Sequence, residues 1–151
     1  MSKTLCIFTL LAFVFLNEYI AQWLLAIHVG GFSVEAGFNE AFKYFSLGGY
    51  LFSSFFRAIP YTLLIIVVLS QTFKNDNAAK AIGWAGLVTI SIYNMYGYWR
   101  AQHAYFTPEH VSSTTAMSLI FIPLYSVFFG AIACAIGYGA VWLYQRLKNY
   151  T

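Results

Sequence analysis

The stretch that decides the fold is Leu5–Val29, with the sequence LCIFTLLAFVFLNEYIAQWLLAIHV. It exceeds the length of about 20 apolar residues that a helix needs to cross the hydrocarbon core of a bilayer. Its one acidic residue, Glu18, lies near the middle. A charge at that depth costs roughly 2.5–3.5 kcal/mol on insertion scales, so it is normally retained for a partner or a task. The stretch predicts a membrane span whose charge needs compensation.

The composition of the whole chain extends this prediction. Of its 151 residues, 60% are hydrophobic and 9% are charged, whereas a soluble domain carries about 25% charged residues. Four stretches are long and apolar enough to be spans, namely Leu5–Val29, Gly48–Phe73, Ala81–Trp99 and Ala116–Tyr144. They occupy most of the chain and leave no room for a soluble domain. We therefore predict one all-α domain over residues 1–151, a four-helix transmembrane bundle.

The segment Phe32–Ser46 separates the first two predicted spans. Phe38, Phe42 and Phe45 recur there at helical spacing. This pattern predicts a short helix lying in the membrane interface. A plain loop is the alternative.

The positive charges outside the predicted spans indicate the orientation, because Lys and Arg concentrate on the cytoplasmic side. With four spans, one side carries Lys3, Lys74, Lys80, Arg146 and Lys148, and the other carries Lys43 and Arg100. Both termini are therefore predicted to be cytoplasmic, in a bacterial inner membrane. The first span is too long for the apolar core of a signal peptide. The net charge of +3 reflects this topology and does not indicate nucleic-acid binding.

Arg57, inside the second predicted span, is the candidate partner of Glu18. Glu18 lies eleven residues before Val29, and Arg57 lies nine residues after Gly48. At 1.5 Å per residue, their depths differ by only about 3 Å. The sequence therefore predicts an intramembrane ion pair between neighbouring antiparallel helices.

Further polar residues share this outer half of the predicted bundle. Asn17 adjoins Glu18, Gln22 follows it by one helical turn, and Asn94 lies at a similar depth in the third span. The inner halves of the spans are almost purely apolar. We therefore predict a polar network around Glu18 and Arg57 that opens outward as a vestibule and is sealed towards the cytoplasm.

Three histidines form a second candidate site. His28, His103 and His110 all fall on the predicted outer side, where Glu109 also lies. Histidine and carboxylate together can bind zinc, copper or iron. The spacing of His103 and His110 matches no standard ligand motif and does not place both rings on one helical face. No cofactor is predicted.

Small residues recur in the last span. Ala131, Ala135 and Gly139 form one row at intervals of four, and Ala133 and Gly137 form another. Such rows let helix backbones approach closely. Packing within the bundle is the slightly favoured interpretation of the first row, and self-association is the alternative.

Three functions are consistent with these patterns. The first is a non-enzymatic multi-pass protein that acts as accessory subunit, assembly factor or immunity-type partner of another membrane protein, because catalytic motifs are missing. The second is a small proton- or ion-coupled transporter. Glu18 with Tyr19 and Trp23 is similar in arrangement to the glutamate that small four-span multidrug exporters place among aromatic residues. Arg57 weighs against it, because it favours the charged carboxylate that a proton carrier must be able to neutralise. The third is the outward-facing metal or redox site.

Overall fold

The computed structural model describes residues 3–72, 76–107 and 115–149. All regular structure in these ranges is helical, so the prediction of an all-α chain is confirmed. The elements are α1 (Lys3–Phe15), α2 (Glu18–His28), α3 (Val34–Ala41), α4 (Leu47–Thr72), α5 (Asp76–His103), the 3-10 helix η1 (Ala104–Phe106) and α6 (Thr115–Lys148).

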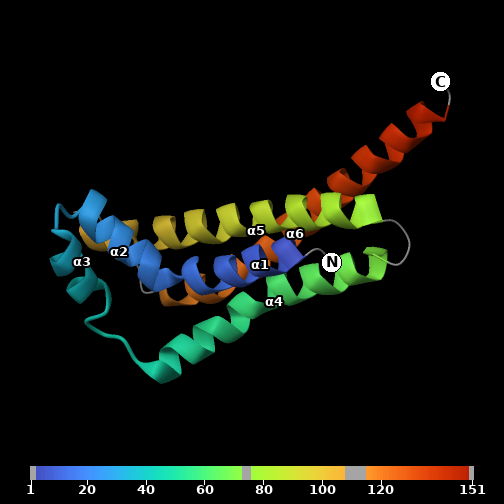
Figure 1. Cartoon of the computed structure of the whole chain (residues 1–151). Helices are drawn as coiled ribbons and strands as arrows, with labels where there is room; N and C mark the ends of the chain where they lie inside the picture. The colour runs from blue at the N-terminus through green and yellow to red at the C-terminus, as the bar shows by residue number, and fades with distance from the viewer. Residues whose placement is uncertain (1–2, 73–75, 108–114, 150–151) are drawn as a thin grey trace.

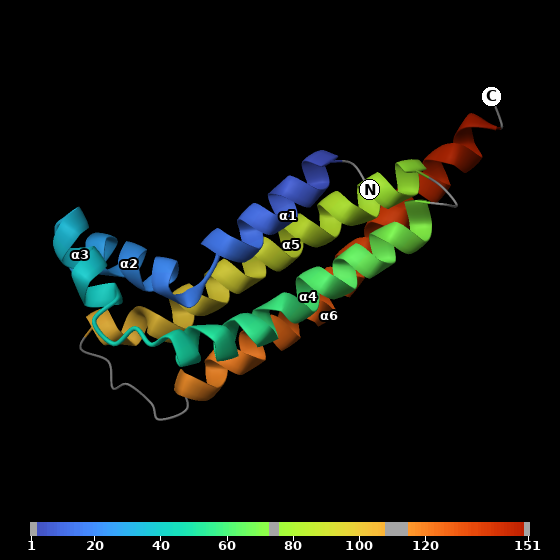
Figure 2. The same cartoon turned by 60° about the horizontal axis from the view of Figure 1, so that its bottom comes forward.

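The three long helices α4, α5 and α6 lie side by side, with α1 along one flank (Figures 1 and 2). Helix α5 is central, because it packs against α6, α4, α2 and α1. Helices α2 and α3 gather at one end of the bundle, which we call the α3 end. Both described termini lie towards the other, terminal end, where the last turns of α6 project beyond its neighbours.

The first predicted span is not one straight helix, and in this respect the sequence-based prediction was wrong. Helix α1 ends at Phe15, α2 begins at Glu18, and their axes differ by 64°. The cause is Asn17, whose extended backbone and side-chain oxygen make it the N-cap of α2. Asparagine is among the preferred N-cap residues, so it starts a new helix where apolarity alone predicts an uninterrupted one.

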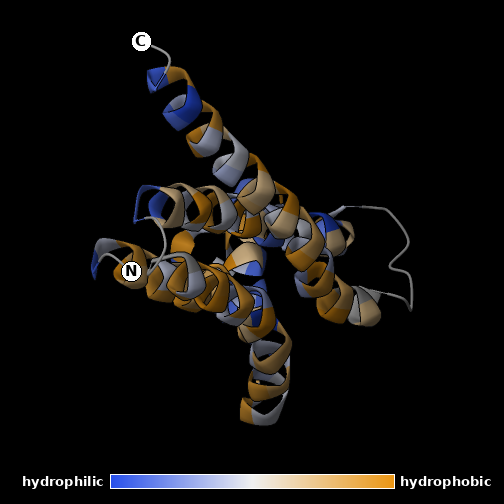
Figure 3. Ribbon diagram, turned by 90° about the vertical axis from the view of Figure 1, so that its right-hand side faces the viewer, coloured by the Kyte–Doolittle hydropathy of each residue, from blue (hydrophilic) through white to orange (hydrophobic). Residues whose placement is uncertain are grey.

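Two helices are long and apolar enough to cross a membrane, at Leu47–Ser70 and Leu119–Lys148. The bent pair α1–α2 is a third candidate if it counts as one span. The third predicted span, residues 81–99, lies inside α5, which is long enough but is not among the candidates. Helix α5 carries polar residues because neighbours cover much of it, and a covered helix needs less apolar surface than one in contact with lipid. Orange, for hydrophobic residues, covers much of the helical ribbon (Figure 3).

The terminal half of the bundle is held by an apolar core. Its buried members are Leu5, Tyr61, Leu64, Val68, Ala79, Ile82, Leu87 and Ile90. Close approach is possible at Gly86, where an added Cβ would stand 2.5 Å from Cδ1 of Leu64 and 2.8 Å from Sγ of Cys134. Because Gly86 has no side chain, α4, α5 and α6 can approach one another closely at this position.

Helix α6 has two different sides. A Cβ at Gly137 would lie 3.0 Å from the carbonyl oxygen of Ala81, so this glycine lets α6 pack on α5. Ala131, Ala135 and Gly139 are exposed, and a Cβ at Gly139 would meet no atom within 4 Å. The slightly favoured interpretation, packing within the bundle, therefore holds for Gly137 and not for Ala131, Ala135 and Gly139. The reason is angular, because residues two apart lie about 200° apart around a helix.

The predicted short helix between the first two spans corresponds to α3. Ser33 caps it by accepting a hydrogen bond from the backbone N–H of Ala36. Its one aromatic residue, Phe38, stacks on Phe42 of the following loop at a centroid distance of 4.4 Å and meets Trp23 of α2 edge to face at 6.0 Å. Together α2 and α3 form one wall of the α3 end.

Candidate functional site

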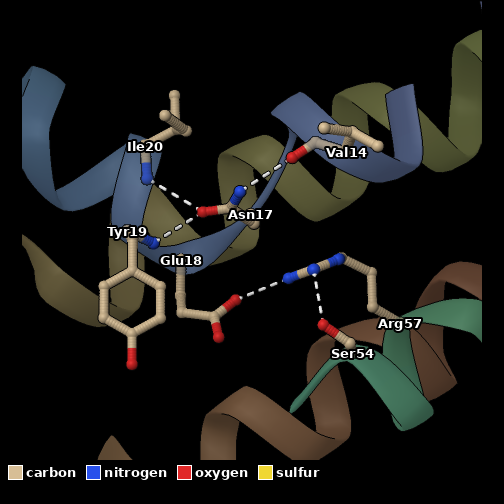
Figure 4. A network of polar contacts seen from close by, with 7 residues as sticks. All are labelled: Val14, Asn17, Glu18, Tyr19, Ile20, Ser54 and Arg57. Atoms are coloured by element: carbon tan, nitrogen blue, oxygen red, sulfur yellow. Dashed lines mark hydrogen bonds and ion pairs between the residues drawn. The ribbon is translucent and has the colours of Figure 1, made fainter. Parts of the chain in front are cut away.

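Glu18 and Arg57 meet at the α3 end of the bundle. Nη1 of Arg57 donates a hydrogen bond of 2.7 Å to Oε2 of Glu18 (Figure 4). The Arg57 side chain is 0% exposed and that of Glu18 is 7% exposed. The structure thus brings together Arg57 of α4 and Glu18 of α2, the two charges that the sequence places at similar depths. Removing either partner from such a pair leaves an uncompensated buried charge.

The backbone around the helix break positions Glu18. The Asn17 side-chain oxygen accepts hydrogen bonds from the backbone N–H groups of Tyr19 and Ile20, and its amide donates to the carbonyl of Val14 (Figure 4). Glu18 is consequently the first residue of α2, where the partial positive charge of the helix N-terminus favours a carboxylate. Asn17 therefore serves as a clamp between α1 and α2. The sequence-based interpretation expected Asn17 to join the network of the ion pair. Among the described residues, however, its side chain makes no hydrogen bond to Glu18 or Arg57.

The Arg57 guanidinium has further partners within the protein. Its Nη2 donates a hydrogen bond of 2.9 Å to Oγ of Ser54. The rings of Phe13 and Tyr50 lie 5.2 and 5.4 Å from its central carbon, within the range of a cation–π contact. Aromatic faces from α1 and α4 therefore replace part of the hydration that the charge loses.

Two rows of buried polar residues extend from this pair. Ser53, Arg57 and Tyr61 follow one another at intervals of four along α4, and Asn94, Tyr98 and Gln102 do so along α5. We call these six residues the polar ladder. Each has at least one buried polar side-chain atom without a hydrogen-bond partner in the part of the chain that the structure describes: Ser53 Oγ, Arg57 Nε, Tyr61 OH, both polar atoms of the Asn94 amide, Tyr98 OH and Gln102 Oε1.

The two rows belong to one neighbourhood. Tyr98 is within electrostatic range of Glu18, Arg57 and Tyr61, and Asn94 adjoins Tyr61. Sequence reasoning selected Asn94 and missed Ser53, Tyr61, Tyr98 and Gln102. The usable signal was the interval of four on both helices, which places polar groups on one face.

A cavity of about 370 Å³ opens beside the ion pair, between α2, α3, α5, η1 and α6. We call it the vestibule. Its lining consists of Glu18, Tyr19, Gln22, Glu40, Ala41, Tyr44, Gln102, Tyr105, Phe106 and Leu119. Gln22, predicted to join the network around Glu18, lines this cavity. Gln102 belongs to both the vestibule and the polar ladder, and Glu18 connects the vestibule to Arg57 of the ladder, so the ladder begins where the vestibule ends.

The histidine site is only partly within the described ranges. His28 is exposed and His103 is half-buried, whereas His110 and Glu109 lie outside the described residues. Over residues 3–72, 76–107 and 115–149, no group of three or more His, Cys, Asp or Glu side chains could hold a metal ion. The metal hypothesis therefore gains no geometric support from the described residues.

Comparison with known proteins gives no match to a family model, to a curated protein or to a solved structure. Inference about function therefore rests on the geometry of the chain itself.

Proposed function

We propose that the chain is a four-span membrane protein in which α5 crosses the bilayer together with α4, α6 and the bent pair α1–α2. What supports this is that α5, with 28 residues, runs along the same bundle and is long enough to cross. The excess of Lys and Arg at the terminal end supports cytoplasmic termini. A bacterial inner membrane is the membrane that we propose. On this topology the vestibule faces outward.

Within the membrane, we propose that the protein acts without catalysis, as an accessory subunit, assembly factor or immunity-type partner that binds another membrane protein. The observation that carries the proposal is the open side of α6. Ala131, Ala135 and Gly139 form a flat strip there that no other described element covers. Lipid contact alone needs no small residues, whereas close contact with a second helix does.

The partner that this strip fits is an apolar transmembrane helix of a different protein, itself with small residues at the contact. Large apolar residues, among them Phe128 and Ile132, are exposed beside the strip. They would flank such a helix as ridges beside a groove. The last turns of α6, which project beyond the bundle, include hydrophilic residues (Figure 3), so the strip for an apolar helix ends before them.

The test is co-purification in mild detergent of the wild type and of Gly139→Leu. The substitution places a large side chain in open space, so it should leave the folded yield unchanged and remove the partner. Ile136→Met, also on the exposed surface, is the matched control and should retain it. If the wild type forms a homo-oligomer that Gly139→Leu abolishes, and no second protein co-purifies, the strip serves self-association. An unchanged set of bound proteins in Gly139→Leu would contradict the proposal.

Transport is a second candidate, favoured by one observation. The vestibule reaches Glu18, the acidic residue inside the predicted span. The ion pair with Arg57 opposes it, because a carrier must release this carboxylate during its cycle. Proton-gradient-driven efflux from vesicles that disappears in Glu18→Gln would support transport, and efflux retained in that variant would exclude a role for Glu18.

A further inference from the structure

The vestibule combines acidic and aromatic residues, and none of the described residues that line it is basic. Its two carboxylates come from Glu18 and Glu40. Oε2 of Glu18 is bound to Arg57, whereas Oε1 has no hydrogen-bond partner among the described residues. Lys43 lies 3.7 Å from Glu40, but both side chains are substantially exposed, so this contact contributes little. Among the described residues, the lining therefore presents carboxylate oxygens and no side chain with a positive charge.

Gln102 supplies an independent observation. Its side chain is buried, with 6% of the residue exposed, and its Oε1 has no hydrogen-bond partner within the described ranges. A buried amide oxygen without a partner costs free energy that a bound donor would recover. Gln102 lines the vestibule, so a half-turn of its amide group would bring this enclosed oxygen to a donor in the cavity.

Aromatic side chains complete the lining. Tyr19, Tyr44, Tyr105 and Phe106 surround the same space as the two carboxylates. The faces of these aromatic rings attract organic cations. The volume of about 370 Å³ lies at the lower end of the range for small-molecule sites.

We propose that the vestibule binds a small organic ammonium ion. Its N–H groups would donate to Oε1 of Glu18 and Oε1 of Gln102, Glu40 would add charge at the mouth, and the aromatic residues would cover its apolar part. The unsatisfied atoms are acceptors, so a primary or secondary amine fits better than a quaternary ammonium. This inference does not depend on the partner of α6, because α6 contributes only Leu119 to the described lining of the vestibule, about three turns before the strip of Ala131, Ala135 and Gly139.

The experiment is calorimetric titration of the purified full-length protein with tryptamine, a primary ammonium ion on an aromatic ring. Tryptophol, which has the same ring and a neutral hydroxyl group, is the matched ligand. Tryptamine should bind at least about tenfold more tightly, because tryptophol lacks the charge. Equal affinity for both ligands, or no saturable binding of tryptamine, would overturn the proposal.

Variants locate the site. Gln102→Leu should weaken tryptamine binding about fivefold by removing an acceptor. Glu40→Gln should weaken it about threefold by removing an exposed charge. Glu35→Gln is the control, because Glu35 is exposed on the same helix and is not part of the lining. Glu40 is half-buried at most, so its variant folds even if Gln102→Leu does not. Identical affinities for Glu40→Gln and Glu35→Gln would overturn the proposal.

Discussion

The contact between α4 and α5 has two halves that differ in chemistry: the buried side chains are polar in one half and apolar in the other. Towards the α3 end, the buried positions are those of the polar ladder. Towards the terminal end, the sequence continues with Leu64 and Val68 on α4 and with Ile90 and Leu87 on α5, all in the apolar core. Tyr61 stands at the change, with its ring in the apolar core and its hydroxyl in the ladder.

This difference shows which half is organised for packing alone. Apolar side chains in the terminal half are satisfied by contact with one another. The buried polar atoms of the ladder carry a desolvation cost that native structures normally offset with partners. Among the described residues, these unpartnered atoms gather in the half of the bundle towards the α3 end, which makes that half the candidate for a functional site. The vestibule opens at that same end.

The largest expected effect comes from breaking the ion pair. Arg57→Ala leaves the Glu18 carboxylate buried without a partner and should lower the free energy of unfolding by about 3–5 kcal/mol. Unfolding in detergent, followed by helical circular dichroism, measures this change. Glu18→Gln combined with Arg57→Gln should recover part of the loss. A double variant no more stable than either single one would show that the two residues are not coupled.

The packed half should respond to added volume. Gly86→Leu forces a side chain against Leu64 and Cys134, and overpacking of this kind typically costs about 1–3 kcal/mol. The same detergent unfolding assay measures it. Gly139→Leu, which adds the same side chain in open space, should change stability by less than about 0.5 kcal/mol. If both variants lose equal stability, α5 does not make the close contact described.

The helix break should depend on its cap. Asn17→Ala removes the acceptor for the N–H groups of Tyr19 and Ile20 and should cost about 1 kcal/mol. Amide hydrogen exchange at these two residues should become faster, while exchange deep in α4 stays unchanged. Asn17→Ser, which retains a capping oxygen, should restore most of the protection. Unchanged exchange in Asn17→Ala would mean that packing alone maintains the bend.

The smallest effect is expected within the ladder. Asn94 is 0% exposed, and its amide has no hydrogen-bond partner among the described residues. Asn94→Leu extends the apolar surface by one position and removes the desolvation cost, so stability should stay equal or rise by up to about 1 kcal/mol. Thermal unfolding in detergent is the measurement. A clear loss of stability would show that the Asn94 amide is hydrogen-bonded, to the neighbouring Tyr61 or to a bound molecule.

Much of the helical plan follows from local sequence. Helices α4 and α6 begin and end within a few residues of the apolar stretches 48–73 and 116–144, because long apolar runs need backbone hydrogen bonds that a helix supplies internally. The break at Asn17 was missed for a local reason as well. Hydropathy averages over many residues, whereas a single capping side chain is enough to end one helix and begin another.

The site divides in the same way. Glu18 and Arg57 are visible in the sequence because charges are rare in apolar runs, and their similar depth follows from residue counting. Tyr98 and Gln102 do not stand out by rarity, because tyrosine and glutamine are ordinary near the ends of spans, and only their interval of four marks them in the sequence. Their burial depends on which face of α5 meets α2 and α4.

The sequence by itself determined that this is a helical chain with apolar runs long enough to cross a membrane and with one opposed pair of buried charges. Only the tertiary structure decided which side of each helix is covered. It left Ala131, Ala135 and Gly139 open, enclosed Gln102, and brought α3 over the vestibule. The physical reason is that composition and periodicity describe each helix separately, whereas burial and cavities depend on how each helix is rotated relative to its neighbours.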